Sequence, residues 1–135
     1  MKVAVADTGV YSEHPWLKGK VVKERTAFED EGISDFVGHG THVAGLIARL
    51  APDVEIYSYK ILNSEGVGDL STIIMAYEWA AEDSVKLMNM SLGANTNCCF
   101  SVLRLVHEQT EAMGIIPVSY THLRAHETSL HLVCR

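Results

Sequence analysis

Apolar residues follow two kinds of pattern along the chain. One is the short continuous run of a buried strand, and the other is the spacing of apolar residues on one face of a helix. The run Val3–Ala6 is continuous and stops at Asp7, which predicts a buried strand that ends in a turn. Between residues 38 and 50 the apolar positions follow helical spacing, and Pro52 lies just beyond them as a stop signal. That helical set is Val43, Ala44, Ile47 and Leu50.

The middle of the chain again has a strand pattern followed by a helix pattern. Residues 54–62 mix β-branched and aromatic side chains, which predicts a strand, and residues 63–68 form a glycine-containing loop. Asp69 is placed to cap the helix that follows. The apolar positions of that helix are Leu70, Ile73, Ile74, Tyr77 and Ala81. A second strand–loop–helix unit is therefore expected here.

The third unit begins with a predicted strand at residues 85–92. A helix follows with Val102, Leu103 and Val106 on its apolar face, Gly114 is its expected C-cap, and residues 115–118 predict a last strand. Strands that alternate with helices favour parallel crossovers and a sheet covered on both faces. The predicted fold class is α/β, a three-layer, doubly wound and mostly parallel sheet.

Ligands of such sheets bind at the carboxyl ends of the strands. Asp7 and the segment around Ser91 both lie at predicted strand ends. A functional site is therefore expected at this edge of the sheet.

Composition and charge narrow the class of protein. Of the 135 residues, 47% are apolar and 21% are charged, values typical of one globular domain and not of a disordered chain. Eleven basic and 17 acidic residues give a net charge of -6, which disfavours nucleic-acid binding. No apolar stretch approaches the roughly 18 residues of a membrane span, and no secretory signal opens the chain, so the sequence predicts a soluble, unexported chain.

Cysteine usage adds little. The chain has three cysteines, and two of them, Cys98 and Cys99, are adjacent, a poor geometry for a mutual disulfide. Thiols that act as small hydrophobic groups are favoured over a metal or redox role.

Three segments carry the candidate chemistry. Residues 3–9 read Val-Ala-Val-Ala-Asp-Thr-Gly, residues 38–45 read Gly-His-Gly-Thr-His-Val-Ala-Gly, and residues 89–93 read Asn-Met-Ser-Leu-Gly. Together they resemble the Asp motif, the His motif and the substrate-binding strand of the subtilisin-like serine peptidases, the subtilase family. The resemblance covers residues 1–117, which we interpret as the N-terminal part of a subtilisin-like peptidase domain, truncated before its C-terminal part.

The resemblance implies a catalytic role for Asp7 and His39. A serine hydroxyl becomes a strong nucleophile when an imidazole accepts its proton, and a buried carboxylate fixes the tautomer of that imidazole. His39 is the expected base and Asp7 the expected orienting carboxylate. His42 and His14 are expected to be structural, and neither is expected to bind a metal.

Substrate binding is expected at two backbone segments. Ser91, Leu92 and Gly93 resemble one edge strand, and the segment Gly66, Val67, Gly68 resembles the opposite edge. An extended peptide would add as a strand between them. An ordinary turn before a helix remains the alternative for Gly66 and Gly68.

Residues 118–135 differ from the rest of the chain. They follow neither period well, and residues 118–128 resemble the in-frame translation of a widely used sequencing-library adapter. We therefore expect the authentic chain to stop near Pro117 and treat residues 118–135 as an artefactual tail. His122, His126 and His131 are accordingly not interpreted as a metal site.

The resemblance also defines what is missing. The triad serine and the oxyanion-hole asparagine of the family have no counterpart here, so the chain alone is expected to be inactive. The parent is expected to be a monomeric, secreted endopeptidase that binds a polypeptide substrate and neither nucleic acid nor membrane. Calcium is possible in the parent, although Trp16 stands where the family often has a calcium-binding carboxylate, and no other cofactor is evident.

Two other functions stay open at this point. A non-catalytic α/β peptide-binding domain, a pseudopeptidase, would keep the fold without catalysis, although it would have no chemical need for both Asp7 and His39. A nucleotide-binding domain is disfavoured because the loop at residues 66–68 lacks a complete phosphate-binding motif.

Overall fold

The structure, a computed structural model, describes residues 1–94, 100–119 and 131–133. Its main sheet has five parallel strands in the order β2-β3-β1-β5-β7. The strands are β1 (Lys2–Asp7), β2 (Val21–Thr26), β3 (Glu55–Lys60), β5 (Leu87–Met90) and β7 (Ile116–Ser119). A second sheet holds β4 (Val67–Asp69), β8 (His131–Val133) and β6 (Gly93–Ala94), in that order.

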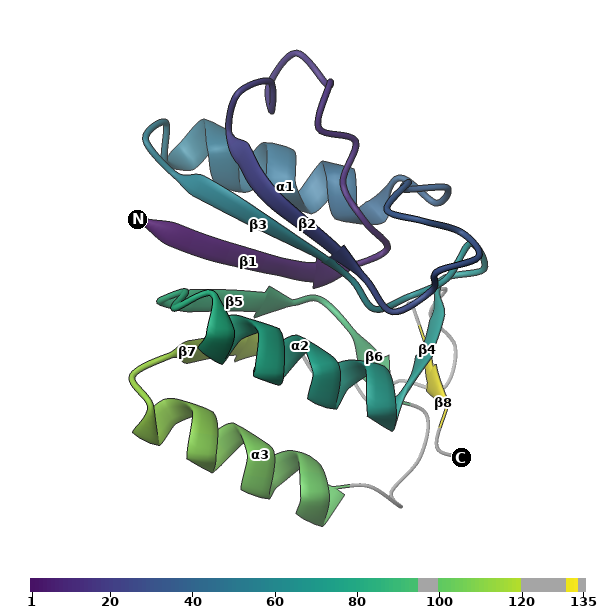
Figure 1. The fold of residues 1–135 in the computed structure, drawn as a ribbon, viewed down its shortest axis with the longest axis vertical. Coiled ribbons are helices and arrows are strands. Elements are labelled where there is room, and N and C mark those ends of the chain that lie inside the picture. Colours follow the sequence, from purple (N-terminus) through teal and green to yellow (C-terminus); the bar gives the residue numbers. More distant parts are fainter. Residues whose placement is uncertain (95–99, 120–130, 134–135) are drawn as a thin grey trace.

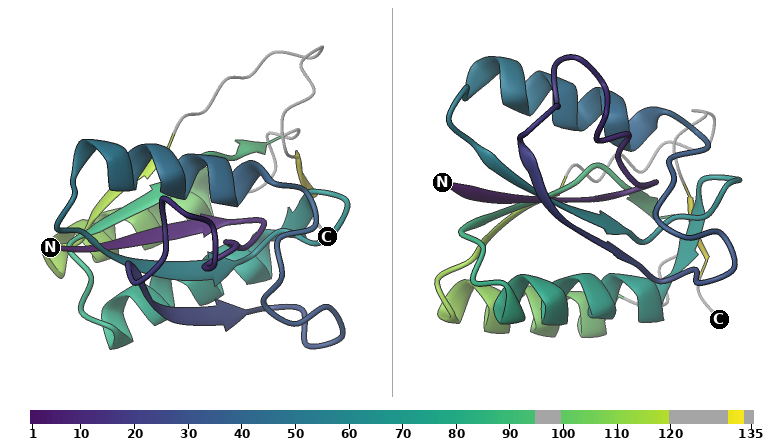
Figure 2. Two further views of the ribbon diagram at one scale, coloured as in Figure 1. Left: turned by 90° about the horizontal axis from the view of Figure 1, so that it is seen from above. Right: turned by 45° about the horizontal axis from the view of Figure 1, so that its top comes forward.

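Helices cover both faces of the main sheet. Helix α1 (His39–Leu50) lies on one face, and α2 (Leu70–Glu82) and α3 (Phe100–Ala112) lie on the other (Figures 1 and 2). The predicted three-layer, doubly wound α/β architecture is confirmed, and it is the parallel pairing that brings the carboxyl ends of β1, β3 and β5 to one edge.

Side chains of β1 point alternately to the two faces of the sheet, so two hydrophobic cores form. Val3 and Val5 face α1 and pack in one buried cluster with Ala44 and Ala48. Ala4 and Ala6 face the opposite side and pack in a second cluster with α2. Because both faces of β1 are covered, its sequence is a continuous apolar run rather than an alternating one.

Helix α2 begins as the sequence predicts. Asp69 accepts a hydrogen bond from the Thr72 N–H at 3.1 Å, and the Thr72 hydroxyl lies 3.2 Å from the Asp69 N–H, which together form a capping box. The predicted glycine at the end of α3 is also confirmed, since Gly114 has a φ of 79°.

One strand was missed, and three local predictions were wrong. The edge strand β2 was missed because Lys23, Glu24 and Arg25 interrupt its apolar pattern. Part of the predicted loop at residues 63–68 is strand β4. Leu50 and Val102, both predicted on apolar helix faces, are 87% and 42% exposed, because one ends its helix and the other lies just inside the start of α3.

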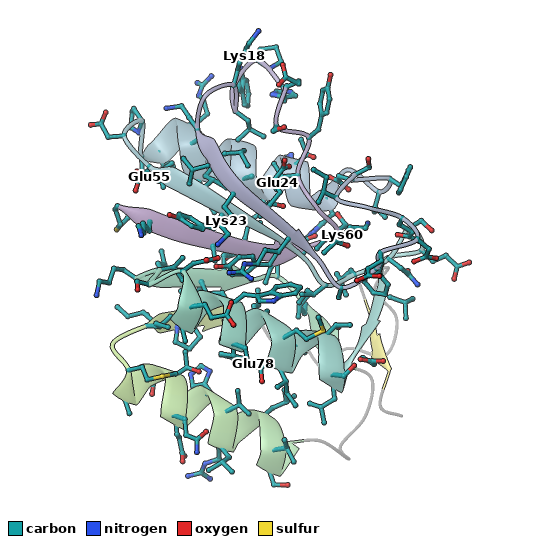
Figure 3. All side chains as sticks on the ribbon, viewed as in Figure 1. Lys18, Lys23, Glu24, Glu55, Lys60 and Glu78 are labelled. Carbon is teal, nitrogen blue, oxygen red and sulfur yellow. The ribbon has the colours of Figure 1, made fainter. Side chains whose placement is uncertain are left out.

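An ion-pair cluster ties the edge strand to the end of α2. Asp83 accepts hydrogen bonds from Lys23 Nζ at 2.6 Å, from Arg25 Nη2 at 2.8 Å and from the Tyr59 hydroxyl at 2.8 Å. Figure 3 shows Lys23 between β2 and α2. Burial raises the pKa of the Asp83 carboxyl, but hydrogen bonds from Arg25, Lys23 and Tyr59 outweigh that effect and hold the pKa at about 2.

Two expectations fall wholly or partly outside the described residues. Cys98 and Cys99 lie in the gap before α3, and most of the predicted tail, including His122 and His126, lies after β7. Strand β8 is the exception, since the backbone of residues 131–133 pairs with β4 and β6 where no strand was predicted. Among the described residues no helix is long and apolar enough to span a membrane.

Candidate active site

Asp7 ends strand β1 with a fully buried side chain. It is the last residue of the strand, in register with Lys60 on β3, and its exposed fraction is 0%. The Thr8 N–H donates to Asp7 Oδ1 at 2.7 Å. Strand and turn thus fix the carboxylate at the carboxyl edge of the sheet.

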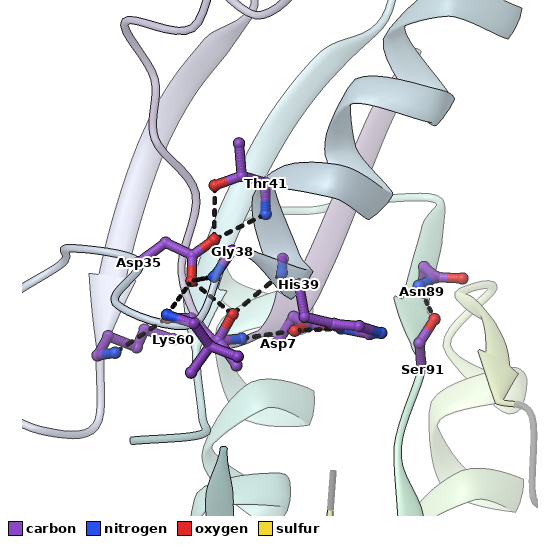
Figure 4. A network of polar contacts seen from close by, with 11 residues as sticks. Asp7, Asp35, Gly38, His39, Thr41, Lys60, Asn89 and Ser91 are labelled. Atoms are coloured by element: carbon purple, nitrogen blue, oxygen red, sulfur yellow. Dashed lines mark hydrogen bonds and ion pairs between the residues drawn. The ribbon is translucent and has the colours of Figure 1, made fainter. Parts of the chain in front are cut away.

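His39 begins helix α1 directly above this carboxylate. Nδ1 of His39 lies 2.8 Å from Oδ1 and 2.9 Å from Oδ2 of Asp7 (Figure 4). Because a carboxylate only accepts, Nδ1 carries the proton and donates it, which leaves Nε2 as the basic nitrogen of a neutral ring. The His39 side chain is 37% exposed, so the ring has one side toward Asp7 and another toward solvent.

The surroundings favour a proton on His39. The hydrogen bond to Asp7 raises the pKa of His39 above its ordinary value, burial opposes the rise, and the negative charges of Asp7 and Asp35 add to it. The arrangement therefore stabilises an imidazolium, the form that a general base takes after accepting a proton.

Gly40 shows why the His segment needs its second glycine. A Cβ at position 40 would clash with the backbone carbonyl of Gly9 and lie 3.2 Å from Asp7 Cβ. Gly38, at the helix N-cap, has a φ of 92°, a conformation that favours glycine. The two glycines let the start of α1 approach the end of β1.

Asp35 is a part of the site that the sequence reasoning missed. It accepts hydrogen bonds from Thr8 and Gly38 on Oδ1 and from Thr41 on Oδ2. Burial raises its pKa, but hydrogen bonds from Thr41, Gly38 and Thr8 outweigh that effect and hold the pKa below its usual range. An aspartate just before a glycine turn is a signal for backbone capping, and it was available in the sequence.

Lys60 is a second missed residue. Its ammonium group is buried behind Asp7, donates to the Thr8 carbonyl at 2.9 Å and lies 3.3 Å from Glu31 Oε2. Glu31 Oε1 in turn accepts from the Ser64 N–H at 3.0 Å. This chain of contacts joins the end of β1 to the loop that precedes β4.

The two predicted substrate segments face one another across a single strand. Val67 and Gly68 lie on β4 and Gly93 on β6, while Gly66 precedes β4 and Ser91 and Leu92 follow β5. Strand β8 pairs in parallel with both β4 and β6. The space between the two segments therefore accommodates one extended backbone.

Gly66, just before β4, and Gly68, on β4, are each required for a different structural reason. Gly66 has a φ of 73° and turns the chain, as the alternative interpretation of this loop requires. A Cβ at Gly68 would clash with the Ile61 carbonyl and lie 2.9 Å from Thr72 Oγ1, so internal packing requires this glycine. On the other edge, Asn89 Nδ2 donates to Ser91 Oγ at 2.9 Å.

The residues around Trp16 do not fit a calcium site. The Trp16 ring lies 4.7 Å from the Arg49 guanidinium and 5.8 Å from the His14 ring, and neither partner is an oxygen ligand. In the part of the chain that the structure describes, no three His, Cys, Asp or Glu side chains are grouped to hold a metal. The other histidine of the motif, His42, lies exposed on α1.

Comparison with known proteins shows the family of the chain. The sequence model of the subtilase family, peptidase S8, matches residues 1–121. Subtilisin DY of Bacillus licheniformis is 36% identical over 129 residues, which cover 88% of this chain and 46% of the relative. An intracellular serine protease of Paenibacillus polymyxa is 39% identical over 107 residues, which cover 69% of this chain and 33% of the relative.

A solved structure is similar as well. The crystal structure of a cold adapted subtilisin-like serine proteinase superposes with a TM-score of 0.75 at 30% identity, covering 87% of this chain and 45% of that chain. This chain thus spans less than half the length of the relatives and of the solved structure that it matches. The family match, the shared fold and the paired Asp7 and His39 agree, and the chain belongs to the subtilase family.

Proposed function

We propose that this chain supplies the aspartate and histidine of a serine endopeptidase. The observation that carries the proposal is the contact of both Asp7 oxygens with Nδ1 of His39 at the carboxyl edge of the sheet. It leaves Nε2 of His39 as the nitrogen that accepts a proton. By resemblance to the subtilase motifs, the proposed proton donor is a serine outside this chain.

The reaction follows from this geometry. Nε2 accepts the proton of the serine hydroxyl as the oxygen attacks the peptide carbonyl, and it returns that proton to the leaving amine. Asp7 keeps its negative charge and stabilises the imidazolium throughout. The 135-residue chain by itself forms no acyl-enzyme in this scheme, and we propose that it is inactive alone.

The proposed substrate is an extended polypeptide bound between β4 and β6. The strand-wide space between these segments supports this proposal, because β8 already pairs with both by backbone hydrogen bonds. Backbone pairing of this kind recognises a peptide of many sequences, while alternate side chains supply the preference. Gly66, Val67 and Gly68 form one wall and Ser91, Leu92 and Gly93 the other.

A matched set of variants tests the function. The gene beyond the codon for Pro117 is recovered from the source sample, and the full-length protein is assayed for hydrolysis of casein. We expect hydrolysis that an organofluorophosphate stops and that His39→Ala lowers by at least about 10³-fold. His107→Ala, on α3, is the control and keeps full activity.

The same assay separates the second candidate. A pseudopeptidase would bind casein-derived peptides without hydrolysing them. Replacement of the triad serine in the gene sequence beyond the codon for Pro117 would also support that function. The presence of both Asp7 and His39 in hydrogen-bond contact favours the catalytic proposal.

The remaining properties of the parent belong to the same proposal. We propose a monomer that needs no calcium at Trp16. We also propose residues 118–135 as a segment foreign to the domain, although Val118 and Ser119 complete strand β7 of the main sheet. The family resemblance implies secretion, although one relative is named an intracellular serine protease. Fractionation of cells that express the full gene decides the compartment.

A further inference from the structure

Five hydrogen-bond donors converge on Asp35, four residues before His39. Oδ1 accepts from Thr8 Oγ1 at 2.8 Å, from the Gly38 N–H at 2.8 Å and from the Val37 N–H at 3.1 Å. Oδ2 accepts from the N–H and the hydroxyl of Thr41 at 2.9 and 2.5 Å. A carboxylate with this many donors is held in one position and stays ionised.

Thr8 connects Asp35 to both members of the pair. Its side chain is fully buried, its N–H donates to Asp7 Oδ1, and its hydroxyl donates to Asp35. The same hydroxyl accepts from the Gly40 N–H at 3.0 Å. The contacts close a ring from Asp7 through Thr8 and the first turn of α1 to His39 (Figure 4).

Helix α1 has no cap of the ordinary kind. The N-cap residue is Gly38, which has no side chain to accept a hydrogen bond. Asp35 performs this task from outside the helix, because it accepts from the N–H groups of Gly38 and Thr41. This carboxylate therefore replaces the missing side-chain cap on the first turn of α1, the turn that carries His39.

The charges around His39 come from two elements. Asp7 faces it from the end of β1, and Asp35 faces it from the loop that enters α1. Lys60, from β3, lies behind Asp7 with its ammonium group on the Thr8 carbonyl and beside Glu31. Asp35 therefore adds a second negative charge near His39, beyond that of Asp7.

We propose that Asp35 is a positioning residue for the Asp7–His39 pair, acting through Thr8 and Thr41 on the imidazole and through its charge on the imidazolium. The consequence for catalysis rests on the proposed function. The effect on His39 does not, because it is a property of this chain alone.

A titration of the chain separates positioning from simple helix capping. The imidazole carbons are labelled with ¹³C and followed by NMR from pH 4 to 10 in the wild type, in Asp35→Asn and in Asp30→Asn. Asp30 is an exposed carboxylate of the same loop, so it matches the change in net charge. We expect Asp35→Asn to lower the pKa of His39 by about half a unit or more and Asp30→Asn to change it by less than a quarter of that.

A second pair of variants covers the case in which Asp35→Asn fails to fold. Thr8→Val removes the hydroxyl at nearly constant volume, and Thr8→Ser keeps it. We expect Thr8→Val to shift the resonance of the Nδ1 proton of His39 and Thr8→Ser to leave it near the wild-type value. Loss of helix stability without any change at His39, in either set, overturns the proposal and leaves Asp35 as a cap only.

The NMR test of Asp35 does not depend on whether the full-length protein is a peptidase. If His39 responds to Asp35 and the full-length protein hydrolyses no casein, the proposed function fails and the positioning role stands. If casein is hydrolysed and Asp35→Asn leaves the pKa of His39 unchanged, the positioning role fails and the function stands.

Discussion

Asp7 presents both carboxylate oxygens to Nδ1 of His39, at 2.8 and 2.9 Å, across a separation of 32 residues. Asp7 ends strand β1 and His39 begins helix α1. The contact therefore depends on the packing of α1 on the sheet as well as on the chemistry of the pair. Changes at this contact should therefore alter both catalysis and the pH dependence of stability.

Asp7→Asn keeps the shape of the side chain and removes its charge. In the full-length protein we expect kcat to fall by about 10⁴-fold, because an amide supports the wrong imidazole tautomer. The raised pKa of His39 stabilises the fold fully below its ordinary value of 6.5, and this contribution is lost as pH rises through the raised value.

The pH dependence of that variant is the corresponding check. Urea unfolding of the wild type and of Asp7→Asn at pH 5 and pH 9 should show a pH-dependent contribution in the wild type that the variant lacks. Equal pH dependence of the free energy of unfolding in both proteins contradicts this assignment.

Two glycines of α1 should respond in opposite directions to alanine. Gly40→Ala places a methyl group against the Gly9 carbonyl, which forces α1 away from β1, and we expect a loss of about 3 kcal/mol or more. Gly45→Ala meets only ordinary contact with Trp16 at 3.6 Å, and a helix-interior alanine gains about 0.5–1 kcal/mol. Thermal unfolding of the two variants measures the difference, and a similar melting temperature for both contradicts it.

Asp83 should control stability in acid. Its depressed pKa means that its contribution is complete above pH 3.8 and is lost as pH falls toward about 2. At pH 7 we expect Asp83→Asn to cost about 2–3 kcal/mol, below the cost for a fully buried pair because Lys23 and Arg25 reach solvent.

Glu82→Gln is the matched control for Asp83. Glu82 also contacts Arg25, at 3.0 Å, but its side chain is 62% exposed, so we expect a change within about 1 kcal/mol. Urea unfolding at pH 7 and pH 2.5 should show that the difference between the two variants is smaller in acid than at neutral pH. A difference of the same size at both pH values argues against the assignment.

Residues after Ser119 should be dispensable for the main sheet. Among the described residues they contribute only β8, which pairs with β4 and β6 and with no strand of the five-stranded sheet. We expect a chain ending at Ser119 to melt within about 2 °C of the full chain. A chain ending at Gly114, which lacks β7, should melt much lower, and equal losses for both would show that residues 120–135 belong to the fold.

The sequence predicted the elements whose signals are local. Helix α2 has a capping residue and a full apolar face, and β1 is buried on both sides, so each shows a clear pattern. Among the described residues, strand β2 pairs only with β3 and lies at the edge of the sheet. Charged residues are tolerated there, so the apolar pattern disappears.

The site was predictable only in part, for the same reason. The resemblance to the family motifs identified Asp7 and His39, because both lie in short contiguous segments. Asp35 precedes a glycine turn, and this local capping signal was available but was not used. Its contact with Thr8, 27 residues earlier, and the contact of Lys60 with Thr8, 52 residues earlier, depend on the folded sheet, and no local pattern reports them.

Labelling by a fluorophosphonate tests whether His39 activates a serine, because attack on phosphorus requires a serine whose proton His39 can accept. The probe is applied to the full-length protein and to its His39→Ala variant, and the modified residue is identified by mass spectrometry. We predict one labelled serine and a labelling rate at least about 100-fold lower in His39→Ala. Labelling that is unchanged by His39→Ala, or a folded full-length protein with no labelled serine, would contradict it.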